Sequence, residues 1–87
     1  MFCKADGNYS HLHLSTGAKY LTSKSLGTLS PFLSADLFVR VHRAYIVNIE
    51  HVVSFDGESN QVEMSNGTLI PVSRRNKREL ISRFNVL

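Results

Sequence analysis

The alternation of apolar and polar residues predicts strands along most of the chain. It is clearest from Phe38 to Asn48, where apolar residues alternate with Arg40 and His42 before the cationic position Arg43. This pattern is typical of a strand that buries one side and leads into a turn carrying positive charge. We therefore take residues 38–48 as the stretch around which the fold is organised.

Three shorter strands are predicted ahead of this stretch, at residues 1–5, 9–14 and 19–22. Asp6-Gly7-Asn8 is a turn between the first two, and Thr16-Gly17 is a candidate two-residue turn between the next two. That second turn fixes which side chains share a face of the hairpin, because side chains alternate along a strand. One face carries Leu12, Leu14 and Leu21, and the other carries His11, His13 and Tyr20.

The period changes to helical spacing in residues 23–34. Apolar residues recur there three and four positions apart, at Leu26, Leu29, Phe32 and Leu33. Ser25 is a good N-cap, but Pro31 lies inside the pattern and cannot continue a helix. We expect one or two short helical turns, with Ser30 capping the second and Pro31 at its first position. Such an element supports the sheet.

Strands return at residues 51–55, 61–65 and 68–72. The last two are separated by Asn66-Gly67, which predicts a type I′ hairpin turn because both of its central residues need positive φ. Pro71 has no backbone donor, so the final strand should lie at a sheet edge.

A C-terminal helix is predicted from an N-cap at Ser73 to about Phe84. Leu80, Ile81 and Phe84 form its apolar stripe, and Lys77 lies at the start of the same face of the helix. Its first turns are strongly basic, with Arg74, Arg75, Lys77 and Arg78. A helix start already presents partial positive charge, so this arrangement disfavours the helix by about 0.3–1 kcal/mol per residue. An anion bound at the helix start would explain this basic arrangement. The alternative interpretation is a basic surface that is only solvated, and for an isolated cluster the two interpretations have equal weight.

Composition narrows the functional classes. At 87 residues the chain forms one domain, too small for a deep enclosed active site. Its net charge of +3 and pI of about 9.4 favour an anionic partner. Cys3 is the single cysteine, which excludes an internal disulfide. No apolar run is long enough for a membrane span and no signal-peptide pattern is present, so we expect a cytoplasmic protein.

Three motifs together resemble the LytTR-type DNA-binding domain, the output domain of many bacterial response regulators of the LytR/AlgR group. They are Ala5-Asp6-Gly7-Asn8-Tyr9, Leu37-Phe-Val-Arg-Val-His-Arg-Ala-Tyr-Ile-Val-Asn48, and Asn66-Gly67 followed by Ile70-Pro-Val-Ser-Arg-Arg75. The resemblance covers essentially the whole chain. It implies a mainly β, elongated antiparallel fold with short helical turns in the middle and a short C-terminal helix. It also implies that loops, and not a recognition helix, enter successive major grooves of a promoter.

Site residues follow from the resemblance position by position. Base contacts are expected from Arg43, from Arg74 and from the loop of residues 8–11, where Asn8, Ser10 and His11 are alternatives. Arginine suits this role because it can donate two parallel hydrogen bonds to guanine. Backbone phosphates are expected to meet His11, Tyr45, Arg75, Lys77 and Arg78. Repeated half-sites and a homodimer are expected by analogy.

Family members usually begin with a further strand or two before the segment corresponding to residues 2–5. We therefore expect this chain to lack the first strands and a receiver domain, and to leave a sheet edge near its N-terminus exposed or covered by a second copy. No catalytic, cofactor or metal site is predicted. His11 and His13 lack a third ligand at a supporting spacing, and no nucleophile or phosphate loop is recognisable.

The remaining alternatives are a small basic β domain for RNA or single strands and a protein-interaction module. The first uses exposed aromatics on one face, whereas Tyr9, Tyr20 and Tyr45 fall on separate elements. Other single residues have structural interpretations. His42 is a hydrogen-bonded structural histidine, Tyr45 packs with Ile46 and Val47, Asn48 bonds its own backbone and Cys3 is a buried strand residue.

Overall fold

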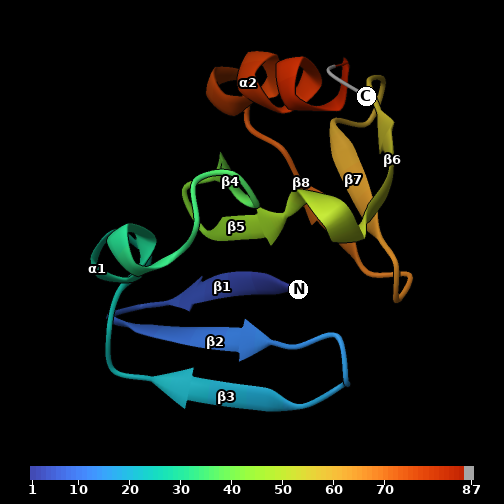
Figure 1. The fold of residues 1–87 in the computed structure, drawn as a ribbon. Coiled ribbons are helices and arrows are strands. Elements are labelled where there is room, and N and C mark those ends of the chain that lie inside the picture. The colour runs from blue at the N-terminus through green and yellow to red at the C-terminus, as the bar shows by residue number, and fades with distance from the viewer. Residues whose placement is uncertain (86–87) are drawn as a thin grey trace.

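Within residues 1–85, the strands form two antiparallel sheets, as the alternating pattern predicts (Figure 1). This computed structural model describes the backbone of residues 1–85 and the side chains of residues 1–83. The first sheet contains β1 (Phe2–Asp6), β2 (Tyr9–His13), β3 (Lys19–Thr22), β4 (Phe38–His42) and β5 (Tyr45–Asn48). The second contains β6 (Val52–Asp56), β7 (Gln61–Met64) and β8 (Leu69–Pro71). The mainly β fold class is confirmed.

β1 lies at the centre of the first sheet, whose strand order is β3-β2-β1-β5-β4. It pairs with β2 on one side and β5 on the other, with Phe2 opposite both His13 and Val47. The expected exposed edge at the N-terminal strand is therefore wrong, because both sides of β1 already have hydrogen-bonded neighbours. The edges of this sheet are β3 and β4.

The second sheet has the order β6-β7-β8, so the strand that ends at Pro71 is an edge strand, as predicted. Helical segments complete the described chain. α1 (Leu26–Leu29) and the 3₁₀ turn η1 (Ser30–Phe32) lie between β3 and β4, the 3₁₀ turn η2 (Ile49–His51) connects the two sheets, and the C-terminal helix α2 (Arg74–Asn85) follows β8. Among residues 1–85, no helix is long and apolar enough to cross a membrane.

Two hairpin loops, β2–β3 and β7–β8, close in a way that the sequence analysis did not predict. The amide of Leu14 donates to the carbonyl of Ala18 at 2.9 Å, and the amide of Met64 donates to that of Thr68 at 2.8 Å. Each loop therefore has three residues, and only the glycine has positive φ, +91° at Gly17 and +87° at Gly67. The type I′ turn predicted for Asn66-Gly67 is wrong.

The longer loop also shifts the register of the first hairpin. Leu12 lies opposite Tyr20, and His11 lies opposite Leu21. The predicted grouping of His11 and His13 with Tyr20 is therefore wrong, because one extra loop residue moves the returning strand by one position and exchanges its faces.

Capping serines begin both α-helices as predicted. The Ser25 side chain accepts a hydrogen bond from the amide of Thr28 at 3.3 Å, and the Ser73 side chain accepts one from the amide of Asn76 at 3.3 Å. Ser30 is not the N-cap of the second turn: it is the first residue of η1 and the C-cap of α1, and Leu29 occupies the N-cap position of η1 without a side-chain bond.

One hydrophobic core joins the two sheets to α2. It contains Phe2, Val39, Val41, Val47, Val62, Met64, Ile70, Val72 and Leu80. Leu80 is fully buried and Ile81 is partly buried, so the predicted stripe on α2 is confirmed for these two residues. The side chain of Phe84, the third member, lies outside the described residues.

A smaller cluster lies on the other face of the first sheet, under α1. It contains Cys3, Leu26 and Ile46. The interpretation of Cys3 as a buried strand residue is confirmed. Because α1 covers this face and the second sheet covers part of the opposite face, the first sheet is held from both sides near β1 and β5 (Figure 1).

Candidate nucleic-acid interface

Strand pairing brings two exposed turns to the same end of the first sheet. The amide of Ala5, near the end of β1, donates to the carbonyl of Ala44 at 2.8 Å, and Lys4 lies opposite Tyr45. The β1–β2 turn therefore lies beside the β4–β5 turn that carries Arg43. Both turns are at the left of the sheet in Figure 1.

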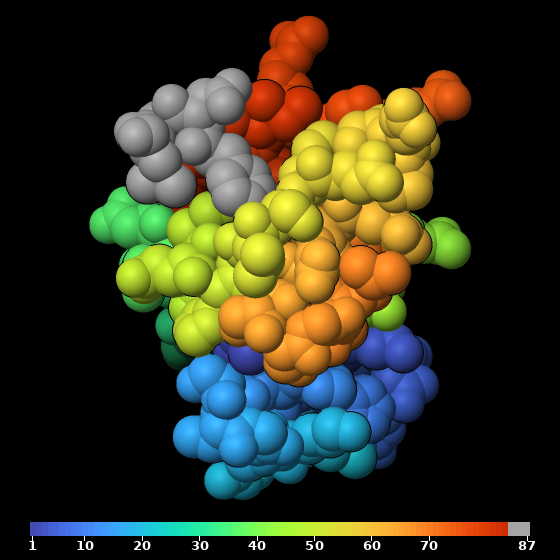
Figure 2. All heavy atoms as spheres, turned by 90° about the vertical axis from the view of Figure 1, so that its right-hand side faces the viewer, coloured from blue at the N-terminus to red at the C-terminus, as the bar shows by residue number. Residues whose placement is uncertain are grey.

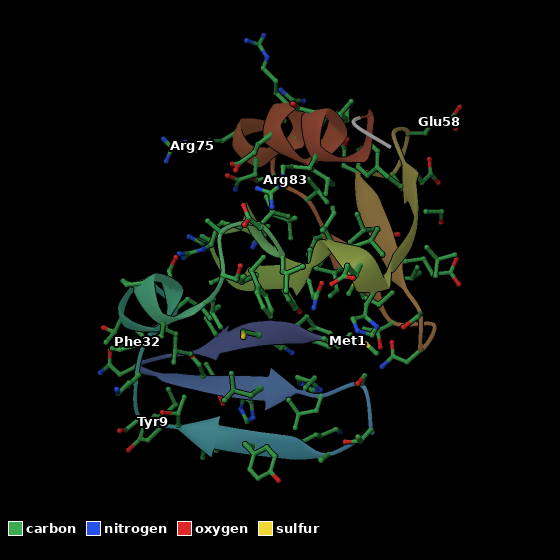
Figure 3. All side chains as sticks on the ribbon, in the orientation of Figure 1. Met1, Tyr9, Phe32, Glu58, Arg75 and Arg83 are labelled. Carbon is green, nitrogen blue, oxygen red and sulfur yellow. The ribbon has the colours of Figure 1, made fainter. Side chains whose placement is uncertain are left out.

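The start of α2 is fixed next to the β4–β5 turn. The amide of Ser73 donates to the carbonyl of Val41 at 2.8 Å, so the helix begins where β4 ends. Figure 3 shows Arg75 on the same side of the molecule as Tyr9 and Phe32, and Glu58 on the opposite side. Three segments that are distant in the sequence thus present polar and basic groups at one end of the domain.

A hollow of about 510 Å³ lies between the β4–β5 turn and the start of α2. It is lined by Arg40, His42, Arg43, Ser73, Arg75 and Asn76. All the charged groups in this lining are arginines, so the hollow is a site for anionic or hydrogen-bond-accepting groups.

The β4–β5 turn is held by its own side chains. Arg40 donates from Nε to the carbonyl of His42 at 3.0 Å and from a terminal nitrogen to the carbonyl of Arg43 at 2.7 Å. The amide of Ala44 donates to Nδ1 of His42 at 3.1 Å, which leaves the proton of the neutral ring on Nε2. His42 is therefore the hydrogen-bonded structural histidine that was predicted.

The Arg43 side chain, by contrast, is exposed and forms no ion pair with any described residue. The register shifts at Arg40/His42, as in a β-bulge, which commonly changes the direction of nearby side chains. Arg40 thus holds the turn through main-chain carbonyls while the guanidinium of Arg43 remains available to a ligand.

The basic start of α2 divides into groups with different surroundings. Arg74, Arg75 and Arg78 are exposed, whereas Lys77 is partly buried, with its Nζ 5.9 Å from the centre of the Phe55 ring. Among the described residues, no acidic side chain forms an ion pair with any of these four. The positive charge that the sequence places at the helix start is therefore not neutralised by an ion pair with any described residue.

The structure brings Arg75, and not Arg74, into the hollow with Arg43. Arg74, one position earlier on the helix, is exposed but does not line the hollow. The sequence analysis assigned Arg74 to the bases and Arg75 to phosphates; this assignment stays a prediction, and Arg75 is the one of the two that shares the hollow with Arg43.

In the β1–β2 region, Asn8 is exposed but Ser10 is fully buried, with 0% exposure. The expectation that Ser10 contacts a base is wrong for this fold, because its side chain is on the face that α1 covers. Tyr9, which was not proposed as a contact, is 50% exposed at the same end as Arg75. The sequence pattern could have predicted the burial of Ser10, because Ser10 lies two positions from the apolar Leu12 on the same strand and shares its face.

His11 and Tyr45 face a different hollow. Nε2 of His11 lies 3.0 Å from a carboxylate oxygen of Asp6. Tyr45 packs against the rings of Phe2 and His42, with centroids 6.5 and 5.9 Å away. Its predicted packing with Ile46 is wrong, because adjacent strand residues point to opposite faces and Ile46 belongs to the cluster under α1. Asn48 bonds its own backbone as predicted, accepting from the amide of Glu50 at 2.9 Å.

Comparisons with known proteins identify the family and a curated relative. The family model described as "LytTr DNA-binding domain" matches residues 1–85. The chain is 35% identical over 78 residues to the CO-responsive transcriptional regulator RcoM of Rhodospirillum rubrum, covering 85% of this chain and 33% of that protein. The chain thus spans about a third of the length of this relative.

A solved structure shows the same fold. It is the LytTr DNA-binding domain of a putative methyl-accepting/DNA response regulator from Bacillus cereus, which matches with a TM-score of 0.84 and 25% sequence identity. The match covers 97% of this chain and 79% of the other.

Proposed function

This chain belongs to the LytTr DNA-binding domain family, and from this premise we propose that its exposed turns and the start of α2 read bases in successive major grooves. The family is one of DNA-binding domains, so DNA is the partner, and we propose that it is bound as a duplex. The relatives named above are a transcriptional regulator and a response regulator. We accordingly propose that the chain serves as the output domain of a bacterial transcriptional regulator.

The observation that carries the groove-reading proposal is the hollow shared by Arg43 and Arg75. A guanidinium that is free of carboxylates can donate two parallel hydrogen bonds to O6 and N7 of guanine, with about 1–3 kcal/mol of discrimination. Two such groups from separate elements, both directed to one side, can meet one duplex. The clamp formed by Arg40 supports the proposal, because a rigid turn positions Arg43 before DNA arrives.

The β1–β2 turn supplies the third proposed contact. Asn8 is a candidate for hydrogen bonds to a base edge, and Tyr9 is a candidate for contact with sugar or base. Arg74 and Arg78 are exposed on α2 outside the hollow, and we propose that they bind phosphates. Such contacts position the protein on DNA without specifying its sequence. Lys77 is a weaker candidate for a phosphate because it lies over Phe55.

A protein that recognises single strands needs several aromatic rings on one surface. Tyr9 and Tyr45 share a sheet face, but Tyr45 is partly buried against the rings of Phe2 and His42. Tyr20, opposite Leu12, lies on the other face. This arrangement favours duplex over single-strand binding. Equal affinity for duplex, single-stranded and RNA probes would contradict the proposal.

The test is selection of bound sequences from a random duplex pool, followed by titration of cognate and scrambled duplexes. Arg75→Ala should lose about 1–3 kcal/mol of binding free energy on the cognate site and much less on the scrambled site. Arg74→Ala is the matched control, because it removes the same group one position away and should weaken both duplexes alike. Equal losses for Arg75→Ala on the two duplexes would overturn the assignment.

Repeated half-sites are also part of this proposal. Footprinting of a selected operator, with and without alteration of one repeat, measures whether two domains bind. Protection of a single half-site by the isolated domain with unchanged affinity would show that pairing is not required.

A further inference from the structure

A second basic hollow lies on the part of the first sheet that neither α1 nor the core covers. Its volume is about 540 Å³, and its polar lining consists of Lys4, His11, His13, Lys19, Asn66 and Thr68. The last two come from the β7–β8 turn. Figure 2 shows this turn, in orange, directly above the first hairpin, in blue.

The basic groups of this hollow come from three adjacent strands. Lys4 lies opposite His11, and His13 lies opposite Lys19. Side chains directly opposite each other share a face of the sheet. The ammonium groups of Lys4 and Lys19 and the imidazoles of His11 and His13 therefore lie on one face.

Compensation within the protein is small. Asp6 contacts His11, but Lys4 and Lys19 form no ion pair with any described residue. The neighbouring β7–β8 turn faces the hollow with neutral side chains only, Asn66 and Thr68. Burial lowers the pKa of His13, and the charges of Lys19, His11, Lys4 and the N-terminal amine lower it further. The imidazole of His13 therefore lies among cationic groups, where a bound anion would favour its protonated form.

We propose that this hollow binds a phosphate group. Lysine ammonium groups are common phosphate ligands, and the hydroxyl of Thr68 and the amide of Asn66 add neutral donors. The site is distinct from the Arg43–Arg75 hollow. His13 is paired with Phe2, at the end of β1 away from the β1–β2 turn. The phosphate has two conceivable sources, the backbone of bound DNA or a free phosphorylated compound.

The first experiment uses pyrophosphate as the probe, in a phosphate-free buffer at pH 7 and constant ionic strength. NMR spectra of the imidazole C–H groups should show saturable shifts for His11 and His13, and the pKa of His13 should rise when pyrophosphate is bound. Lys19→Gln should weaken binding by about tenfold, because a charge-assisted contact is lost. Lys24→Gln is the matched control. It removes an equal charge from the chain, but Lys24 lies over the Phe32 ring and does not line this hollow.

Absence of saturable shifts, or equal weakening by the two lysine substitutions, would overturn the proposal. The amide spectrum of Lys19→Gln shows whether that variant is folded, and Lys4→Gln provides a second variant from another strand with the same expected loss.

The second experiment separates the two sources. In the complex with selected duplex DNA, competition between pyrophosphate and DNA for His11 and His13 would identify the backbone as the source. Simultaneous binding of both would identify a free phosphorylated ligand. Because the pyrophosphate titration needs no DNA, its failure is distinguishable from a failure of the proposed base contacts.

Discussion

The amide of Ser73 donates to the carbonyl of Val41 at 2.8 Å, and this single bond joins the start of α2 to the end of β4. Val41 is fully buried in the main core, and Ser73 caps the helix with its side chain. The basic end of the helix and the turn carrying Arg43 are therefore positioned by one rigid connection. Their relative position does not depend on flexible loops, which suits a site that must match the spacing of base pairs.

The clamp within the β4–β5 turn can be tested with Arg40→Lys. Lysine keeps the charge but cannot donate to both the His42 and Arg43 carbonyls from one planar group. We expect the free energy of unfolding to fall by about 1–2 kcal/mol. We also expect discrimination between cognate and scrambled duplex to decrease although Arg43 is intact. Arg78→Lys, at an exposed position, is the control, and equal behaviour of the two variants in chemical denaturation and DNA titration would show that the clamp is unimportant.

The β7–β8 loop depends on glycine at its third position. Gly67 has φ of +87°, whereas Gly57 does not have positive φ, and an added Cβ at Gly57 makes an ordinary contact 3.9 Å from the Phe55 ring. Gly67→Ala should lower the free energy of unfolding by about 1–2 kcal/mol because a side chain disfavours left-handed backbone. Gly57→Ala should change it much less. Urea denaturation measures both, and similar losses would mean that the loop tolerates alanine.

Cys3 should be chemically inert in the folded protein. Its side chain is 3% exposed, and burial raises the pKa of its thiol, so the reactive thiolate is scarce. We expect slow reaction with a thiol reagent in native buffer and rapid, complete reaction in denaturant. Mass spectrometry at timed intervals checks this, and fast native labelling would indicate that β1 separates from its neighbours.

The stability of the domain should decrease in mildly acidic solution because of His13. The pKa of its imidazole is lowered in the fold, by burial first and then by nearby cations, so the unfolded chain binds the proton more readily. Stability is therefore lost as the pH falls from about 7 through the ordinary histidine pKa of about 6.5 toward the lower folded value. Thermal unfolding at several pH values should show this loss in the wild type and a smaller one in His13→Gln. A parallel pH dependence in both proteins would exclude His13 as its cause.

Local patterns in the sequence predicted most of the elements, because alternation, capping serines and Pro71 act through short-range physics. The errors arose where the choice of a hydrogen-bonded pair, and not residue type, determines the structure. Asn66-Gly67 is the strongest short signal for a type I′ turn, yet the loop includes Ser65 because Met64 bonds Thr68. Whether a hairpin loop has two or three residues depends on which amide and carbonyl close it. The residue types of the turn alone do not determine that pairing register.

The candidate site was predicted in its parts but not in its orientation. Arg43 follows directly from the end of an alternating strand. The choice between Arg74 and Arg75 depends on the rotation of α2 about its axis, which the buried Leu80 and the Ser73–Val41 bond determine together. The burial of Ser10, by contrast, could have been predicted, because Ser10 and the apolar Leu12 are two positions apart on one strand and share a face. The second basic hollow was not predicted, because it requires the β7–β8 turn to pack over the first hairpin.

The central position of β1 determines how a polypeptide attached upstream would be oriented. The carbonyl of Met1 accepts a hydrogen bond from the amide of Asn48 at 2.8 Å, and Figure 3 places Met1 at the end of β1 away from Tyr9. A tether joined there would leave the sheet at the end opposite the Arg43–Arg75 hollow. Tension on such a tether would reach the sheet through its middle strand, which pairs with both β2 and β5, and so would act on both exposed turns together.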